Sequence, residues 1–512
     1  MDRKWLEMSR TNNSIRNIKF AIIGQGMALI VSFIARMVFV KVLGAEYLGV
    51  NGLFTNLLSI LAFAELGIGT AITYSMYKPL AVRDINQIKT LMRLFKRAYL
   101  TIGTSILILG LSFTPFLDKL LKDMPNIDHL PLIYIMFVIN SSISYFYSYK
   151  RSLIIADQKY HIDTLYRYGF KIALDILQII VLLITKNFLL FLALQTVMTF
   201  LQNLSISRKA EKMYPYIKEK NIKKMDVGTK NTIIKNVKAL IYHKVGSIVV
   251  MGTDNILISK FVGIAAVGIY SNYYLIIGAV NTVSGVMFQS MTASIGNLGV
   301  TANKEKKLFV FDCLNFITFW IYGFSSIALL ILFNPFIEIW LGDEFLFPML
   351  ITLLIVLNFY VGSMRKSVLT FREALGLYWY DRYKPLFEAG INLVVSIILV
   401  NKIGISGVFV GTFFSTITTC FWVEPYILYK HGFNHPVRSY FFRYLFYTLT
   451  IVFTGYVTWT ITEKVGSSSI LALILKICIV TIVPNVIFGI FYSKTKEFKY
   501  FKKLILSKLI RK

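Results

Sequence analysis

The stretch KVLGAEYLGV runs from Lys41 to Val50, and a similar stretch, KFVGIAAVGI, runs from Lys260 to Ile269. Both copies keep a lysine and two glycines at the same spacing. Glycine allows a sharp reversal of the backbone and a close approach of another segment. The repeat therefore predicts that one kind of tight turn occurs twice in the fold.

The rest of the chain is strongly apolar. Of its 512 residues, 56% are hydrophobic and 16% are charged, and the mean hydropathy is +0.63. Apolar runs of about 20 residues recur along the chain, which is the length that crosses roughly 30 Å of hydrocarbon as a helix. This pattern predicts an all-α integral membrane protein and excludes a soluble multi-domain protein.

We predict fourteen transmembrane helices from these runs. Their spans cover residues 18–41, 48–77, 98–117, 130–149, 172–185, 188–207, 239–260, 267–297, 308–333, 346–364, 386–401, 404–429, 444–462 and 467–493. The fifth span is short. The i, i+4 spacing of Lys171 and Asp175 indicates that its helix begins in the cytoplasmic interface, before the span itself.

The basic residues predict the orientation. If the N-terminus is cytoplasmic, the two terminal tails and six alternate loops hold 45 of the 55 Lys and Arg, whereas the outer loops hold seven. Basic residues in short loops stay on the cytoplasmic side. The charge distribution therefore predicts that both termini are cytoplasmic.

The net charge of +29 does not predict a nucleic-acid partner. A nucleic-acid binder gathers its positive charge on one soluble face, but here the charge is spread over eight segments on one side of a membrane. The basic tail before the first apolar run predicts a retained helix rather than a cleaved signal peptide. The three cysteines lie inside apolar runs and have no disulfide or metal spacing, so we expect no metal site.

The repeated turn also predicts the domain organisation. Six crossings separate the two copies, so the two halves keep the same orientation and form a parallel repeat, related by a pseudo-two-fold axis along the membrane normal. We predict a first six-helix lobe over 1–207, a basic cytoplasmic linker over 208–238 and a second lobe over 239–429. Residues 430–512 then form two further helices and a basic tail.

Three stretches resemble a known family: ARMVFVKVLGAEYLGVNGLF (Ala35–Phe54), AELGIGTAI (Ala64–Ile72) and TDNILISKFVGIAAVGIYSNY (Thr253–Tyr273). They are similar to the polysaccharide-unit flippases of the multidrug/oligosaccharidyl-lipid/polysaccharide exporter superfamily, which are relatives of the lipid II flippase and of the multidrug and toxic compound extrusion transporters. The likeness covers both predicted lobes.

The resemblance implies a bacterial plasma-membrane flippase. Its substrate would be a polyprenyl-pyrophosphate-linked oligosaccharide, moved from the inner to the outer leaflet for capsule or another surface polysaccharide. It implies a monomer, with membrane lipids, a polysaccharide polymerase and glycosyltransferases as partners and without a cofactor. Coupling to H⁺ or Na⁺ stays open, and the thirteenth and fourteenth helices would contact the lipid tail.

Polar residues inside the predicted spans are the candidate substrate-binding residues, because the membrane rejects them unless they face a cleft or a partner. At 100° per residue, they form stripes on the first, second and seventh helices. The set comprises Gln25, Arg36, Asn51, Glu65, His243, Lys244, Ser247 and Asp254, and the predicted structural turns use Gly44, Gly49, Gly263 and Gly268.

Several of these residues have a second interpretation. Arg36 either binds a pyrophosphate or extends to the outer headgroups. Glu65 either pairs with Arg36 or a lysine, or takes up H⁺ or Na⁺. Asp254 either binds substrate or caps a polar network near Lys260, and His243 and Lys244 lie near the inner mouth.

The function also has alternatives. A cation-coupled multidrug exporter has the same predicted architecture, and a membrane glycan polymerase or ligase is a third class. We expect no enzyme, because the chain has no phosphate-binding loop and no H-E-x-x-H motif.

The orientation can be tested by labelling. In a variant without native cysteines, a single cysteine at Asp343 should react with an impermeant thiol reagent from outside intact cells. One at Lys499 should react only after permeabilisation, because Lys499 lies in the basic C-terminal tail. Outside labelling at Lys499 would overturn the predicted topology.

Overall fold

A computed structural model describes residues 3–61, 65, 68–120, 127–157, 159–219, 228, 253–377, 380–466 and 469–510. These residues form helices and short connections, with no strand among them. Eleven of their helices are long and apolar enough to cross a membrane, or up to twelve if one bent pair forms a single span. The predicted all-α, multi-span fold class is confirmed.

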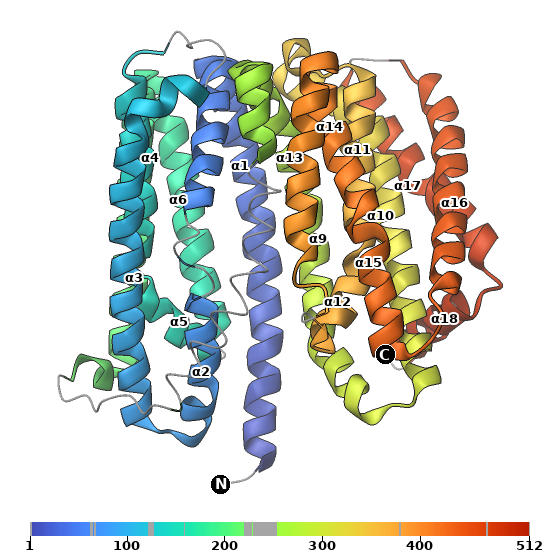
Figure 1. The fold of residues 1–512 in the computed structure, drawn as a ribbon, viewed down its shortest axis with the longest axis horizontal. Coiled ribbons are helices and arrows are strands. Elements are labelled where there is room, and N and C mark those ends of the chain that lie inside the picture. The colour runs from blue at the N-terminus through green and yellow to red at the C-terminus, as the bar shows by residue number, and fades with distance from the viewer. Residues whose placement is uncertain are drawn as a thin grey trace. The chain divides into compact units, whose positions relative to one another are not determined.

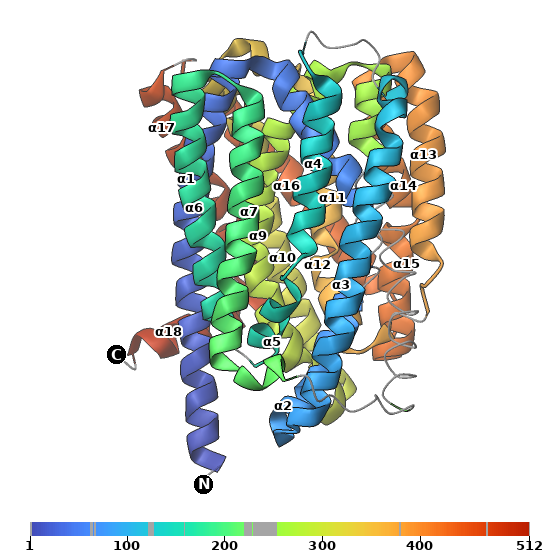
Figure 2. The same ribbon diagram turned by 90° about the vertical axis from the view of Figure 1, so that its left-hand side faces the viewer.

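The chain divides into two compact units, residues 1–268 and 269–512. In unit 1, α6, α7, α4 and α3 lie side by side (Figure 2). The elements of unit 1 are α1 (Arg3–Leu61), α2 (Ile68–Val82), α3 (Ile85–Phe113), η2 (Thr114–Leu120), α4 (Leu130–Tyr145), α5 (Tyr149–Ala156), α6 (Tyr160–Thr185), α7 (Phe188–Met213) and η3 (Pro215–Lys218), and the start of α9 (Ile264–Thr301).

The repeated stretch forms the two predicted turns. Gly44 interrupts α1 with φ 85° and ψ −177°, so α1 consists of two helices joined at a kink. Gly263 occupies the equivalent position of the second copy, directly before α9, and has φ 140°. An L-residue rarely adopts such angles, which explains why both copies carry glycine at this position.

The second glycine of each copy contacts the backbone of the other copy. A Cβ built on Gly49 would lie 2.0 Å from the carbonyl oxygen of Ile264, which follows Gly263 in the chain. A Cβ built on Gly268 would lie 2.3 Å from the carbonyl oxygen of Ala45, which follows Gly44. The contact is thus reciprocal, and only a residue without a side chain fits at either position.

Short polar residues set where several helices begin. The Asp84 carboxylate accepts a hydrogen bond from the Gln87 amide at 3.0 Å, and the Asn187 side chain accepts one from Leu190 at 3.1 Å. Each bond satisfies an amide that has no partner within its own helix. These caps fix the first residues of α3 and α7, and the two-residue turn before α7 is completed by Lys186 in the left-handed region.

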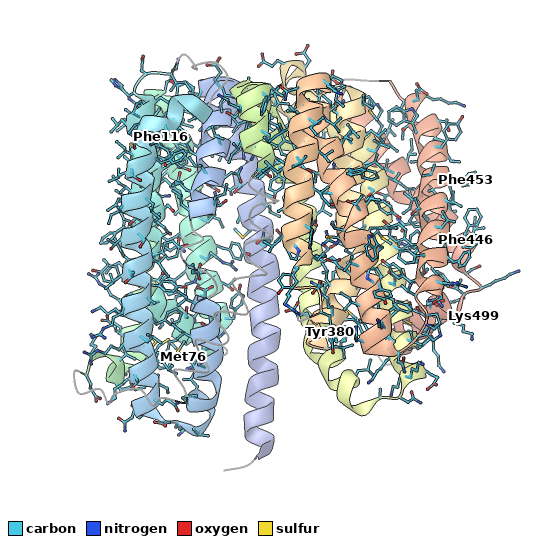
Figure 3. The ribbon with its side chains drawn as sticks, viewed as in Figure 1. Met76, Phe116, Tyr380, Phe446, Phe453 and Lys499 are labelled. Atoms are coloured by element: carbon cyan, nitrogen blue, oxygen red, sulfur yellow. The ribbon has the colours of Figure 1, made fainter. Side chains whose placement is uncertain are left out.

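The core of unit 1 joins α2, α3, α5 and α7. Met76 of α2, Phe95 of α3 and Leu153 of α5 are fully buried and belong to one apolar cluster, which also includes Ala210 of α7. Met76 is labelled in Figure 3. This cluster holds the charged first turns of α3 against α5, so it determines where the basic side chains of that region lie.

Unit 2 continues α9 and contains the remaining helices (Figure 1). They are α10 (Lys304–Leu341), η4 (Asp343–Phe345), α11 (Met349–Met364), α12 (Lys366–Ala374), α13 (Lys384–Ile403), α14 (Ile405–Thr418), α15 (Cys420–Ile427), the π-helical η6 (Leu428–Phe433), α16 (Arg438–Glu463), α17 (Ile470–Tyr492) and α18 (Lys496–Ile510).

Aromatic packing joins α16 and α17 to α10. The Phe319 ring is stacked on Tyr447 with centroids 4.2 Å apart and lies 4.9 Å from Phe488. The Trp320 indole donates a hydrogen bond to Asn485 at 2.7 Å. On the other side of α16, Phe446 and Phe453 project outward (Figure 3) and are 64% and 52% exposed, as expected for side chains that contact lipid.

The observed helices differ from the predicted spans in a few places. Within the predicted span 48–77, α1 extends to Leu61 and α2 begins at Ile68, and of the residues between them only Glu65 is described. The predicted span 404–429 breaks at Thr419, between α14 and α15. The span 239–260 and the linker 208–238 lie largely outside the described residues. The short fifth span belongs to α6, which begins at Tyr160, so the early start predicted for that helix is confirmed.

The reciprocal glycine contact predicts a measurable difference between two variants of α1. Gly49→Ala places a methyl group against the Ile264 backbone and should lower the free energy of unfolding by about 1–3 kcal/mol. Gly26→Ala, also on α1, meets nothing within 4 Å and should leave stability unchanged or slightly raised. Thermal unfolding of both purified variants in detergent measures this. Equal midpoints would contradict a tight contact.

Candidate functional site

The polar stripe predicted on the first helix faces α6 in unit 1. The Tyr168 hydroxyl of α6 donates a hydrogen bond to Gln25, and the Ser32 hydroxyl donates one to the Asp175 carboxylate at 2.7 Å. Tyr168 and Asp175 are seven residues apart, which places them on one face of α6. Polar side chains of α1 and α6 therefore form hydrogen bonds with each other over two helical turns.

Asp175 is the charged centre of this interface. Its side chain is 3% exposed, and Lys171 lies 2.6 Å away at the i, i+4 position. A carboxylate within an apolar helix needs a positive partner and hydrogen-bond donors, and Asp175 has both. Lys171 and Asp175, whose spacing predicted an early start of this helix, thus form an ion pair on α6.

Arg36 lies on α1, one turn beyond Ser32, and is partly buried. Asn51 lies on the second part of α1, also partly buried, and its carbonyl oxygen accepts a hydrogen bond from the Thr55 hydroxyl at 2.6 Å. Both residues lie within residues 24–61, a stretch that is long and apolar enough to cross a membrane. A guanidinium presents five hydrogen-bond donors in a plane.

Glu65 has a phenol as a hydrogen-bond donor. The Tyr99 hydroxyl of α3 donates to its carboxylate at 3.0 Å, and the Tyr99 ring packs against Phe95 and Tyr145 at 4.8 and 5.7 Å. A phenol stabilises the carboxylate without neutralising its charge. This arrangement leaves the proton-uptake interpretation of Glu65 open.

The seventh predicted helix is described only in its last part. Asp254 lies in the helical stretch 253–261 and is partly buried. His243, Lys244 and Ser247 lie outside the described residues. In the described residues, Gln25 and Ser32 thus form hydrogen bonds with α6, and Glu65 forms one with α3.

Unit 2 contains a buried ion network that the sequence analysis missed. Arg365 donates two hydrogen bonds to the Glu424 carboxylate, from Nε to Oε2 at 2.9 Å and from Nη2 to Oε1 at 2.7 Å. Lys384 donates to the same carboxylate, and the Glu424 side chain is 0% exposed. Such a two-pronged, charge-assisted contact is among the strongest that a carboxylate makes.

Two further acids complete the network. Arg372 pairs with Asp381 and lies 3.7 Å from Glu424, and Glu388 lies 3.7 Å from Arg365. Three cations thus face three carboxylates, so the cluster is neutral overall. It ties the end of α11 and α12 to α13 and α15, which makes it a positioning element of unit 2 rather than a binding site for a charged ligand.

One signal in the sequence could have found this network. Glu388 and Glu424 lie inside the predicted spans 386–401 and 404–429, where an acid requires a cation beside it. The preceding segment, residues 365–384, supplies Arg365, Arg372 and Lys384. The sequence does not show which of these cations reaches which acid, because that depends on how the helices pack.

No protein-family model matches this chain, and no curated protein matches it. Solved structures do match. The lipid II flippase MurJ in an inward closed conformation matches with a TM-score of 0.64 at 13% identity, covering 93% of this chain and 99% of that chain.

Two multidrug transporters match less completely. A mutant of the Vibrio cholerae MATE transporter VcmN gives a TM-score of 0.56 at 13% identity, covering 84% of this chain and 99% of that one. An inward-facing MATE family transporter of the MOP superfamily gives 0.58 at 16% identity, covering 80% and 98%. The chain therefore has the fold that the lipid II flippase shares with the MATE transporters.

The buried network of unit 2 predicts a large stability effect. Glu424→Gln removes the negative charge that Arg365 and Lys384 share and should cost about 3–5 kcal/mol of unfolding free energy, because two buried cations lose their partner. Glu373→Gln removes an exposed charge on the neighbouring α12 and should change stability by less than about 0.5 kcal/mol. The measurement is the midpoint of thermal unfolding of each purified variant in detergent. Similar midpoints for the two variants would refute the predicted role of Glu424.

Proposed function

We propose that this protein is a flippase that moves a polyprenyl-pyrophosphate-linked oligosaccharide from the inner to the outer leaflet of a bacterial plasma membrane by alternating access. The exported unit would serve a capsule or another surface polysaccharide. Glycosyltransferases would act before the flippase and a polymerase after it. The protein would work as a monomer with cytoplasmic termini.

The observation that carries this proposal is the extent of the match to the lipid II flippase. That match covers 93% of this chain and 99% of the flippase, whereas the two MATE transporters cover 84% and 80% of this chain. The match that covers more of this chain is thus the one to a flippase for lipid II.

The charges of unit 1 support an anionic substrate. Arg36 is a cation in a membrane-spanning helix, and a central, lipid-facing position would cost it about 2.5–3.5 kcal/mol. A diphosphate that passes beside it would lower this cost, since a guanidinium binds two phosphate oxygens at once. The membrane potential would assist export of the negative charge by about 2.3 kcal/mol per charge per 100 mV.

A cation-coupled multidrug exporter is the second candidate, and Glu65 is the residue that favours it. Its carboxylate accepts a hydrogen bond from the Tyr99 hydroxyl, and a carboxylate within a predicted membrane span is a candidate site for H⁺ or Na⁺. The two candidates differ in what drives transport. We expect the membrane potential to favour outward transport of a diphosphate lipid whether or not a cation is also coupled to it, whereas a cation-coupled exporter requires the H⁺ or Na⁺ gradient.

Arg36 gives the test of the proposed function. Arg36→Ala should reach the membrane normally, because removing a charge favours insertion, but should abolish surface glycan in a strain lacking the native protein. Arg36→Lys should restore part of the export, since an ammonium keeps the charge without the planar fork. The measurement is surface glycan at equal membrane levels of each variant.

Lys402→Ala is the matched control, because it removes an exposed cation at the end of α13. It should export normally. Full export by Arg36→Ala would remove Arg36 from the mechanism. Transport of organic cations without movement of a lipid diphosphate, measured with purified protein in liposomes, would favour the multidrug exporter instead.

A further inference from the structure

Unit 1 contains a basic pocket apart from the polar residues of α1. Its volume is about 440 Å³, and it is lined by residues of α3, α5 and η3 with the residue that follows η3: Lys89, Met92, Arg93, Lys96, Arg97, Leu100, Tyr149, Lys150, Ile217, Lys218 and Glu219. A cavity of this size accommodates a small ligand or the headgroup of a larger one. Six of these eleven residues are cations.

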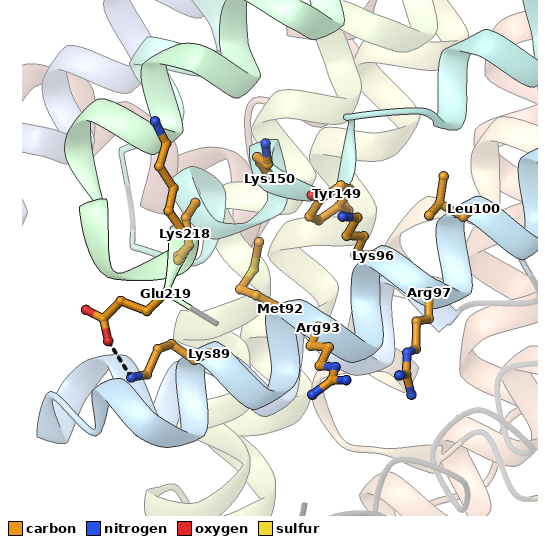
Figure 4. Close-up of a pocket in the computed structure, with 11 residues that line it drawn as sticks. Lys89, Met92, Arg93, Lys96, Arg97, Leu100, Tyr149, Lys150, Lys218 and Glu219 are labelled. Carbon is orange, nitrogen blue, oxygen red and sulfur yellow. Dashed lines mark hydrogen bonds and ion pairs between the residues drawn. The ribbon is translucent and has the colours of Figure 1, made fainter. Parts of the chain in front are cut away.

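Two carboxylates order part of the pocket. Lys89 pairs with Glu219 at 2.9 Å, as Figure 4 shows, and Lys150 and Lys218 both pair with Glu211, which is not among the lining residues. Among the described residues, six cations against two carboxylates leave an excess of four positive charges. The lysine that pairs with Glu219 has a side chain only 9% exposed, so this part of the wall is built into the fold.

The remaining three cations all belong to α3. Arg93, Lys96 and Arg97 follow an i, i+3, i+4 spacing and have no carboxylate partner in the part of the chain that the structure describes. Lys96 extends toward Tyr149, while Arg93 and Arg97 extend along the other flank of α3 (Figure 4). Three such cations fit an anion that carries two or more negative charges.

The pocket also lies where α3 changes from charged to apolar. Leu100 lines it, and from Leu100 to Phe113 the helix contains no charged residue. Met92 and Ile217 add apolar walls. A basic site at the membrane boundary with apolar sides matches a ligand whose charged group is attached to a hydrocarbon chain.

We propose that this pocket binds a phosphate-bearing group with at least two negative charges, such as a diphosphate ester, at the end of unit 1 that the charge distribution assigns to the cytoplasm. The diphosphate could be carried by a lipid or be free in solution. In either case, Arg93, Lys96 and Arg97 supply the unpaired positive charge, and Lys89 and Lys150 supply the ordered wall. The inference does not depend on which substrate the protein transports.

The test uses the purified full-length chain in detergent with farnesyl diphosphate and inorganic pyrophosphate as probes. The triple variant R93Q/K96Q/R97Q should weaken binding of farnesyl diphosphate by at least about tenfold, because it removes three charge-assisted contacts. K499Q/K502Q/K503Q is the matched control. It removes three exposed lysines of α18 at the same i, i+3, i+4 spacing and should change binding by less than about twofold.

The two probes distinguish the sources of the anion. If pyrophosphate binds as tightly as farnesyl diphosphate, the ligand is a soluble diphosphate; if it binds much more weakly, the ligand is a lipid headgroup. Equal losses in both triple variants, or no loss in either, would overturn the proposed site. Normal flipping by R93Q/K96Q/R97Q in liposomes, together with lost binding, would separate this site from transport and leave the proposed function intact.

Discussion

The structure depends on a contact between two pieces of backbone. Gly49 and Gly268 each lie against the carbonyl group that follows the turn glycine of the other copy, so the two turns lock together without side chains between them. This contact joins α1, the first helix of the chain, to the first turns of α9, which continues into unit 2. Within a membrane, helices gain little from excluding water, and close backbone packing is one of the few ways to hold them together.

Sequence patterns predicted much of the fold because apolar length and basic loops are constraints of the bilayer itself. The fold class, the two turns at Gly44 and Gly263 and the early start of α6 are all found in the structure. The patterns did not predict the break at Thr419, because α14 and α15 are both apolar and read as one continuous span. Apolar composition alone does not predict where a helix breaks within an apolar span.

The candidate site was less predictable for a related reason. Periodicity placed Gln25 and Arg36 on one polar stripe of α1, and the structure shows that Gln25 and the neighbouring Ser32 have partners on α6. The identity of those partners depends on which helices become neighbours, and residues 32 and 175 are far apart in the sequence. The same holds for Tyr99 beside Glu65 and for the cations around Glu424. In the sequence, the basic residues at the start of α3 indicated only which side of the membrane that segment lies on. The fold shows that they line one pocket together with Lys150 and Lys218.

The packing of α16 and α17 on α10 affects how the chain must be made. Phe319 and Trp320 of α10 have their partners in Tyr447, Phe488 and Asn485, which are synthesised much later. During translation, α10 therefore enters the bilayer with this face covered by lipid, and the indole of Trp320 lacks its acceptor until α17 has been inserted. A chain truncated before α17 would keep the Trp320 indole as an unsatisfied donor in the membrane. We expect such a chain to be degraded by proteases that recognise polar groups exposed within the bilayer.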